Sequence, residues 1–156
     1  MLSIAIPGLD DLAIEHLVLD FNGTIACDGR LLEGVEPALR TLSERLTIHV
    51  VTADTFGTAV KQLTGLPTHV TVLAAGNQHI AKRDFVRALG PDVTACIGNG
   101  RNDRLMLAEA AMAIAVVLGE GAAVETVLAA DVVATDIVAA LDLLVRPDRL
   151  IATLRS

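Results

Sequence analysis

The sequence has 156 residues and a formal net charge of −7. A chain of this length can enclose one continuous apolar core but rarely two, so we expect a single domain over residues 1–156. The acidic balance repels phosphate backbones, and with three Phe and no Trp or Tyr the chain lacks surfaces on which bases stack. Nucleic acid is therefore excluded as an expected partner.

The longest apolar run covers residues 110–118 and is far shorter than the roughly 20 residues that a bilayer requires. The first residues carry no basic segment ahead of an apolar one, and Asp10 and Asp11 come before any stretch long enough for export. Cys27 and Cys96 lie far apart without a CxxC pattern, as expected of reduced thiols. We expect a cytoplasmic protein with no membrane partner.

Short runs of apolar and β-branched residues alternate with longer stretches that carry apolar residues at helical spacing. After an N-terminal strand at 3–6, the pattern predicts strands at 16–20, 48–52, 70–73, 93–97, 113–117 and 131–134. It predicts helices at 36–45, 55–63, 78–89, 103–111, 122–128, 137–144 and 147–154. The alternation implies right-handed crossovers between parallel strands. The expected fold class is α/β, a three-layer, doubly wound and mostly parallel sheet, and the gaps between elements leave no room for a cap domain.

Polar residues follow several predicted strands at the point where each strand ends. The segment DFNGT at 20–24 follows the strand at 16–20, TAD at 52–54 ends the next strand, and GNGRND at 98–103 follows the strand at 93–97. Lys82 lies near the start of a predicted helix. In an open α/β sheet, ligands bind beyond the carboxyl ends of the strands. We therefore expect these side chains to form one site.

These residue types suffice for the transfer of a phosphoryl group. Asp20 supplies a carboxylate nucleophile, which needs a cation to offset its repulsion from the phosphate oxygens. A Mg²⁺ ion takes oxygen ligands, and here would draw them from Asp20, a nearby backbone carbonyl and an acidic group in the 98–103 loop. Thr52 can donate a hydrogen bond to a phosphoryl oxygen, and Lys82 can place a positive charge beside the transferred group. Gly23 permits a tight turn with amide donors open to an anion.

The order and spacing of these segments over residues 17–117 resemble the haloacid dehalogenase-like (HAD) superfamily. Its members carry a nucleophile loop, a Ser or Thr at a strand end, a Lys and an acidic metal loop. Within the superfamily the sequence is most similar to the phosphorylation domain of P-type ATPases, because DFNGT parallels their DKTGT, TAD their TGD, and GNGRND their GDGxND. Nothing here supplies the transmembrane helices or nucleotide-binding insertion of a pump, so ion transport by this chain alone is not expected.

The resemblance implies a Mg²⁺-dependent phosphatase or phosphotransferase that acts on a small-molecule phosphate ester through an aspartyl-phosphate. It also implies a role for each matching residue. The expected catalytic residues are Asp20, the nucleophile, with Thr52 and Lys82. The expected phosphate-binding residues are Asn22, Gly23, Thr52, Ala53 and Lys82. The expected metal ligands are Asp20, the Asn22 backbone carbonyl, Asn99 and Asp103.

Two positions depart from the superfamily's pattern. Asn22 stands where efficient phosphatases carry the Asp that protonates the leaving group and then activates water, so we expect slow hydrolysis or a long-lived aspartyl-phosphate. Asn99 replaces the first acid of the metal loop and removes one negative charge, which lowers the expected metal affinity. The sequence leaves open whether Asn99 or Asp103 binds the ion directly.

Each position also has an ordinary structural interpretation. Asn22 with Gly23 can form a tight turn, Thr52 or Asp54 can cap the following helix, and Lys82 can be a solvated surface lysine. The alternative function is therefore a non-catalytic phosphate-sensing or interaction module with the same fold.

A receiver domain of two-component signalling is disfavoured. Receivers place paired acids after the first strand and the phospho-acceptor two strands later, whereas Asp10 and Asp11 precede a strand here. An uncapped site stays open to solvent, and uncapped members of the superfamily often cover it with a neighbouring subunit or act on large substrates. A homo-oligomer is therefore the expected assembly.

Overall fold

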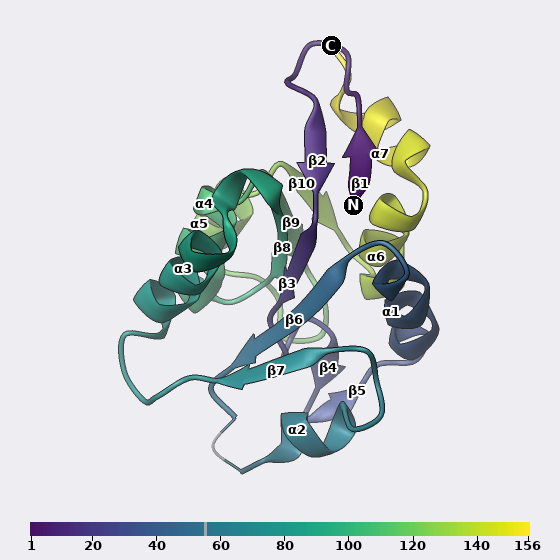
Figure 1. Ribbon diagram of the computed structural model, residues 1–156. Coiled ribbons are helices and arrows are strands. Elements are labelled where there is room, and N and C mark those ends of the chain that lie inside the picture. The colour runs from purple at the N-terminus through teal and green to yellow at the C-terminus, as the bar shows by residue number, and fades with distance from the viewer. Residues whose placement is uncertain (55) are drawn as a thin grey trace.

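The computed structural model describes residues 1–54 and 56–156. Its centre is a sheet of six strands in the order β10-β9-β8-β3-β6-β7, and every pairing within the sheet is parallel (Figure 1). The strands are β3 (His16–Leu19), β6 (Thr47–Thr52), β7 (His69–Val72), β8 (Thr94–Gly98), β9 (Met112–Val116) and β10 (Val132–Ala134). The predicted α/β fold with a parallel sheet is confirmed.

Helices cover both faces of this sheet (Figure 1). One layer contains α1 (Val35–Ser43), α6 (Ile137–Val145) and α7 (Pro147–Leu154). The opposite layer contains α3 (Gln78–Leu89), α4 (Arg104–Glu109) and α5 (Val124–Leu128). The short helix α2 (Thr58–Gln62) follows β6 at the lower edge of the view. The three-layer, doubly wound architecture is therefore as predicted.

Alternating residues of the central strands are buried in two separate apolar cores, one on each face. Leu17 and Leu19 of β3 belong to the core that α1, α6 and α7 cover. Val18, between them, belongs to the core beneath α3 and α4. All three side chains are fully buried. A strand covered on both faces needs apolar residues at every position, which explains the continuous apolar runs in the sequence.

Two small antiparallel hairpins lie outside the main sheet. The strand expected at 3–6 is β1 (Leu2–Ile4), and it pairs with β2 (Leu12–Ile14), which was not predicted. The pair β4 (Ala26–Cys27) and β5 (Arg30–Leu31) follows the loop after β3 and was also not predicted. The two-residue strands β4 and β5 are too short to show a period in sequence, so pattern reasoning misses them.

Helix boundaries differ from the predicted ones by a few residues. The helix expected over 55–63 is α2 at Thr58–Gln62, and residue 55 lies outside the described residues. The helix expected over 103–111 begins at Arg104, because residues 101–103 form the 3-10 turn η2 (Arg101–Asp103). Between β3 and α1 the described chain contains the β4–β5 hairpin and no inserted domain, in line with the predicted absence of a cap.

No helix in the described part of the chain is both long enough and apolar enough to cross a membrane.

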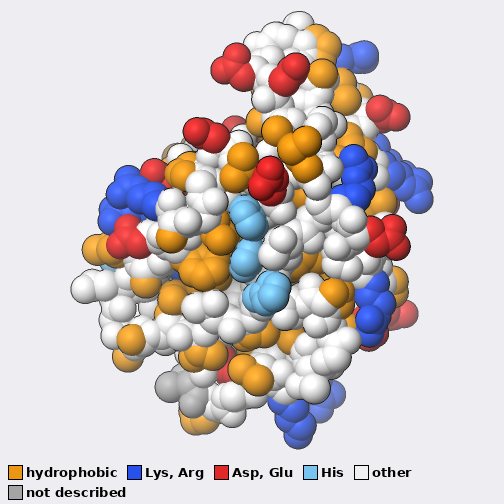
Figure 2. Space-filling view, in the orientation of Figure 1, with side chains coloured by type: hydrophobic (Ala, Val, Ile, Leu, Met, Phe, Trp, Pro, Cys, Tyr) orange, Lys and Arg blue, Asp and Glu red, His pale blue; other side chains and the backbone are white. Residues whose placement is uncertain are grey.

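Three histidines form a row on one surface of the sheet (Figure 2). His16, His49 and His69 come from the neighbouring strands β3, β6 and β7, with ring centroids 5.3 and 5.6 Å apart along the row. His49 Nε2 lies 3.2 Å from His16 Nδ1. Burial, together with His16 and His69, lowers the pKa of His49 to about 4. His49 is therefore uncharged at neutral pH.

The aromatic residue next to Asp20 offers a direct test of the core. Phe21 is fully buried, whereas Phe56 is 93% exposed. Phe21→Ala leaves a cavity and lowers the free energy of unfolding by about 3–5 kcal/mol. Phe56→Ala changes it by less than about 0.5 kcal/mol. Urea titration followed by far-UV circular dichroism measures both changes, since the chain has no Trp or Tyr for fluorescence. Equal stabilities for the two variants would contradict the placement of Phe21.

Candidate active site

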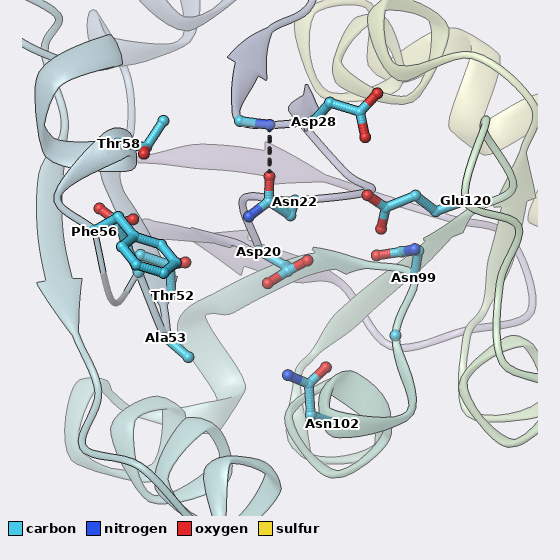
Figure 3. A pocket seen from close by; sticks show the side chains of 13 residues that line it. Asp20, Asn22, Asp28, Thr52, Ala53, Phe56, Thr58, Asn99, Asn102 and Glu120 are labelled. Atoms are coloured by element: carbon cyan, nitrogen blue, oxygen red, sulfur yellow. Dashed lines mark hydrogen bonds between the residues drawn. The ribbon is translucent and has the colours of Figure 1, made fainter.

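A cavity of about 660 Å³ opens at the carboxyl ends of β3, β6 and β8 (Figure 3). Asp20 and Asn22 reach it from the loop after β3, Thr52 and Ala53 from the end of β6, and Asn99 from the loop after β8. Parallel strands end at one edge of a sheet, so segments far apart in sequence meet there. The structure thus brings together the three strand-end segments that the sequence singled out.

The floor of the cavity rests on a buried group of three charges. Lys82 of α3 is 1% exposed, and its Nζ lies 2.6 Å from Asp20 Oδ1 and 2.6 Å from Asp103 Oδ1. Asp20 is 7% exposed and faces the cavity, whereas Asp103 is fully buried. Lys82 is therefore not a surface lysine, and it contacts the expected nucleophile from behind.

The charges in this group depend on one another. Burial by itself lowers the pKa of Lys82, but the carboxylates of Asp20 and Asp103 outweigh burial and raise that pKa above its ordinary value. Burial raises the pKa of Asp103 to about 6, and the charge of Asp20 adds to this rise while Lys82 opposes it. Lys82 is consequently a permanent cation at neutral pH, held between two acids.

Asp103 is fully engaged by the protein. Its Oδ2 accepts hydrogen bonds from the backbone amides of Asn99 and Gly100, at 3.0 and 2.9 Å, while its Oδ1 accepts from Lys82. Both oxygens therefore have protein partners, and Asp103 is not among the residues that line the cavity, so direct metal binding by Asp103 stays a prediction. Asn99, the other candidate from the same loop, lines the cavity.

Thr24 joins the two sides of the site. Its buried hydroxyl lies 3.2 Å from Asp20 Oδ2 and 3.2 Å from Asn99 Oδ1, so it can donate to either oxygen. The sequence reasoning gave Thr24 no role of its own. The available signal was its place as the last residue of the DFNGT segment.

The loop after β3 is held by its own backbone. The Phe21 carbonyl accepts from the amides of residues 24, 25 and 26 at 3.2, 3.1 and 3.0 Å, and the Gly23 amide donates to the Ala26 carbonyl at 2.8 Å. The Gly23 amide is therefore not open to an anion, contrary to expectation. Gly23 adopts φ +80°, and a Cβ on it would lie 2.5 Å from Glu120 Oε2 and 2.8 Å from Asn99 Oδ1. Its role is to leave this space open.

Asn22 ties the loop to the β4–β5 hairpin. Its Oδ1 accepts a hydrogen bond from the Gly29 amide at 3.1 Å (Figure 3, dashed line). This bond holds the hairpin at the rim of the cavity, where Asp28 and Gly29 also line it. Helix α2 contacts β5 of this hairpin, and Asp54 Oδ2 accepts from the Ala59 amide in the first turn of α2 at 2.8 Å. Asp54 thus satisfies a backbone amide of this helix, in line with the capping interpretation of its sequence position, although the N-cap residue is Gly57.

Glu120 is a cavity residue that the sequence reasoning missed. It lies in the turn after β9, and its carboxylate points toward Asn99 (Figure 3). The rule that ligands gather beyond the carboxyl ends of strands, applied to the strand predicted at 113–117, would have found it.

The oxygen-rich surroundings of Asp20 suit a hard divalent cation. Asp20 and Asn99 line one cavity, and the lack of a side chain at Gly23 leaves room beside it for the Asn99 amide and the Glu120 carboxylate. Within residues 1–54 and 56–156, no three or more His, Cys, Asp or Glu side chains are grouped as metal ligands. A cation here would therefore depend on amide and carbonyl oxygens besides carboxylates, a donor set that Mg²⁺ accepts and Zn²⁺ does not favour.

The amino-acid sequence of this chain is similar to those of known proteins. No protein-family model matches it. It is 42% identical to the uncharacterized protein MJ0073 of Methanocaldococcus jannaschii over 84 residues, which are 51% of this chain and 90% of MJ0073. The chain belongs to the same protein family as MJ0073. A second uncharacterized protein of that organism, MJ0072, is 51% identical over 39 residues, which are 25% of this chain and 89% of MJ0072.

Solved structures identify the fold. A 3-deoxy-D-manno-octulosonate 8-phosphate phosphatase from Moraxella catarrhalis, in complex with magnesium, phosphate and KDO, has a TM-score of 0.68 and 18% identity, covering 91% of this chain and 94% of that one. The cobalt-bound phosphatase of the same name from Haemophilus influenzae has a TM-score of 0.72 and 13% identity, covering 92% and 94%. This chain therefore shares its fold with these phosphatases.

The buried lysine provides a test of the charge group. Lys82→Met keeps the length of the side chain but leaves two carboxylates without a counter-ion. We expect the free energy of unfolding at pH 7 to fall by about 3–5 kcal/mol, the usual result of removing one partner from a buried ion pair. The chain's other lysine, Lys61, is exposed and supplies the matched control.

Lys61→Met should change stability by less than about 0.5 kcal/mol. Urea titrations of both variants and the unmodified chain give the comparison. If Lys82→Met is as stable as Lys61→Met, Lys82 does not occupy the buried position between the two acids.

Proposed function

We propose that this protein is a Mg²⁺-dependent phosphatase or phosphotransferase that forms an aspartyl-phosphate on Asp20. The observation that carries the proposal is the Asp20 carboxylate at the floor of an open cavity, backed at 2.6 Å by the buried cation of Lys82. The HAD fold, shared with solved phosphatases, supports the same reaction class. One fold can host many functions, so the side chains of the site carry more weight than the fold in assigning this activity.

Each side chain has a defined part in the proposed reaction. An Asp20 oxygen attacks phosphorus, the bond from phosphorus to the ester oxygen breaks, and the leaving alcohol takes a proton from solvent. The Thr52 hydroxyl donates a hydrogen bond to a phosphoryl oxygen. Lys82 orients Asp20 through the 2.6 Å contact between its Nζ and Asp20 Oδ1. Water then attacks the aspartyl-phosphate, which releases phosphate and restores the carboxylate.

The proposed metal ligands are Asp20, the Asn22 backbone carbonyl and Asn99. When bound, Mg²⁺ neutralises the charge of the phosphate oxygens and so reduces their repulsion from the attacking carboxylate. Asp103 acts indirectly in this scheme, because it holds both Lys82 and the backbone of the loop that carries Asn99.

Slow turnover is part of the proposal. The Asn22 side-chain amide cannot act as a general acid or base at neutral pH, and its oxygen accepts a hydrogen bond from the Gly29 amide. Neither the leaving group nor the attacking water then receives help from this position. The finer likeness to the phosphorylation domain of P-type ATPases, based on DFNGT, TAD and GNGRND, supports a long-lived aspartyl-phosphate.

The cavity opens to solvent, so we propose a small-molecule phosphate ester as substrate. A homo-oligomer in which a second copy shields the cavity, and a cytoplasmic location, belong to the same proposal.

Trapping the covalent intermediate tests the nucleophile. The chain is incubated with Mg²⁺ and radiolabelled acetyl phosphate, then denatured in acid. We expect hydroxylamine-labile label on the unmodified chain and none on Asp20→Asn, since a carboxamide does not attack phosphorus. Asp11→Asn, an exposed position remote from the cavity, carries the same charge change and should keep the label. Equal labelling of Asp20→Asn rules out this nucleophile. No label on the unmodified chain, with weak phosphate binding, favours the non-catalytic module.

Restoring the missing acid tests the reason for slow turnover. Asn22→Asp places a proton donor two residues after Asp20, and we expect steady-state hydrolysis of an aryl phosphate to rise by roughly 10²-fold. Stopped-flow or discontinuous phosphate release measures the rate. Asp28→Asn, at the same rim of the cavity, is a control for altered charge and should not raise it. An unchanged rate in Asn22→Asp means that proton transfer does not limit turnover.

A further inference from the structure

Glu120 occupies a defined place at the edge of the proposed metal site. It lines the same cavity as Asp20 and Asn99, and it reaches the cavity from the turn after β9. No cation of the described residues forms a salt bridge with its carboxylate. Its carboxylate is exposed at the cavity, so a cation from solvent can reach it.

The turn that carries Glu120 is fastened to Asn99. Asn99 Nδ2 donates to the Gly121 carbonyl at 3.1 Å, and the Asn99 carbonyl accepts from the Ala123 amide at 2.9 Å. The Gly121 amide closes the turn on Leu118 at 2.9 Å. An Asp at position 99 would have no N–H to donate to Gly121. The Asn at this position therefore serves to hold the turn in place.

Glu120, Asn99 and Asp20 line the same cavity, and their side chains lie close to one another. The point where a Cβ of Gly23 would sit is nearest to Asn99 Nδ2, followed by Glu120 Oε2 at 2.5 Å and Asn99 Oδ1 at 2.8 Å, so the Glu120 carboxylate lies beside the Asn99 amide. Thr24 links Asn99 Oδ1 to Asp20 Oδ2 through its hydroxyl. Figure 3 shows the Glu120 carboxylate and the Asn99 amide side by side, on the Asp20 side of the turn.

We propose that Glu120 supplies the second carboxylate of the metal site. In the superfamily's pattern that carboxylate belongs to the metal loop, at the position that Asn99 occupies here. The inference rests on the proposed function, since it adds a ligand to the same Mg²⁺ site. Residue 99 carries no negative charge, and the Glu120 carboxylate after β9 supplies that charge instead. The Asn99 amide holds the turn that carries Glu120. Metal affinity depends on the number of charged oxygen ligands, so the relocation restores the affinity that the loop alone would lose.

Metal binding itself, without turnover, tests the inference. Mn²⁺ replaces Mg²⁺ as the probe, and electron paramagnetic resonance measures the free Mn²⁺ that remains at each protein concentration. We expect Glu120→Gln to weaken binding roughly tenfold or more through the loss of one charged ligand. Glu33→Gln, an exposed acid outside this cavity, should bind as the unmodified chain does.

A double variant distinguishes a lost ligand from a lost surface charge. Asn99→Asp combined with Glu120→Gln returns the carboxylate to the metal loop, where the position of the turn no longer matters, and should restore most of the affinity that Glu120→Gln loses. The net charge of this double variant equals that of the unmodified chain.

The outcomes separate this inference from the proposed function. If Asp20→Asn abolishes Mn²⁺ binding while Glu120→Gln leaves it unchanged, the metal site stands and Glu120 is not a ligand. If Glu120→Gln and Glu33→Gln weaken binding equally, general charge and not ligation is responsible, and the inference fails. If the unmodified chain binds no Mn²⁺, the metal site fails and the inference fails with it.

Discussion

The site depends on one buried cation shared by two acids. Lys82 brings together a helix, the end of β3 and the loop after β8, since its ammonium group lies 2.6 Å from both Asp20 and Asp103. Removing three charges from water is costly, and the cost is offset only where each charge has partners in good geometry. Here the backbone amides after β8 and the Thr24 hydroxyl occupy the remaining oxygens. The polar groups are therefore held rigidly before any ligand arrives.

The two acids bound to Lys82 differ in their access to the cavity. Asp103 is fully buried and accepts hydrogen bonds from Lys82 and two backbone amides, whereas Asp20 lines the cavity. The two asparagines hold backbone in different ways. Asn22 accepts from the hairpin at the rim, a bond that an Asp could also accept, whereas Asn99 donates to the turn that carries Glu120, which an ionised Asp could not do. Only at residue 99 does the amide add a contact that a carboxylate would lack.

Sequence reasoning reached the fold because its signals are local and repeated. Continuous apolar runs such as 16–20 indicate strands buried on both faces, and helical spacing between them indicates crossovers. It reached the meeting of Asp20, Thr52 and Asn99 for a topological reason, since parallel strands end at one edge of the sheet. It missed β2 and also β4 and β5, whose two residues each carry no period. It expected amide donors open to an anion at the Gly23 turn, where the Gly23 amide donates within the loop.

The amino-acid sequence by itself determined the class of fold, the edge of the sheet where a site would lie and the residue types available there. Hydrophobic period and the order of strand ends are properties of the chain alone. Only the tertiary structure decided which oxygens face the cavity, because that depends on hydrogen-bond partners brought from distant segments. Asp103 and Glu120 show the difference: the former is turned inward by Lys82 and two amides, and the latter is brought to the cavity by a turn fastened to Asn99.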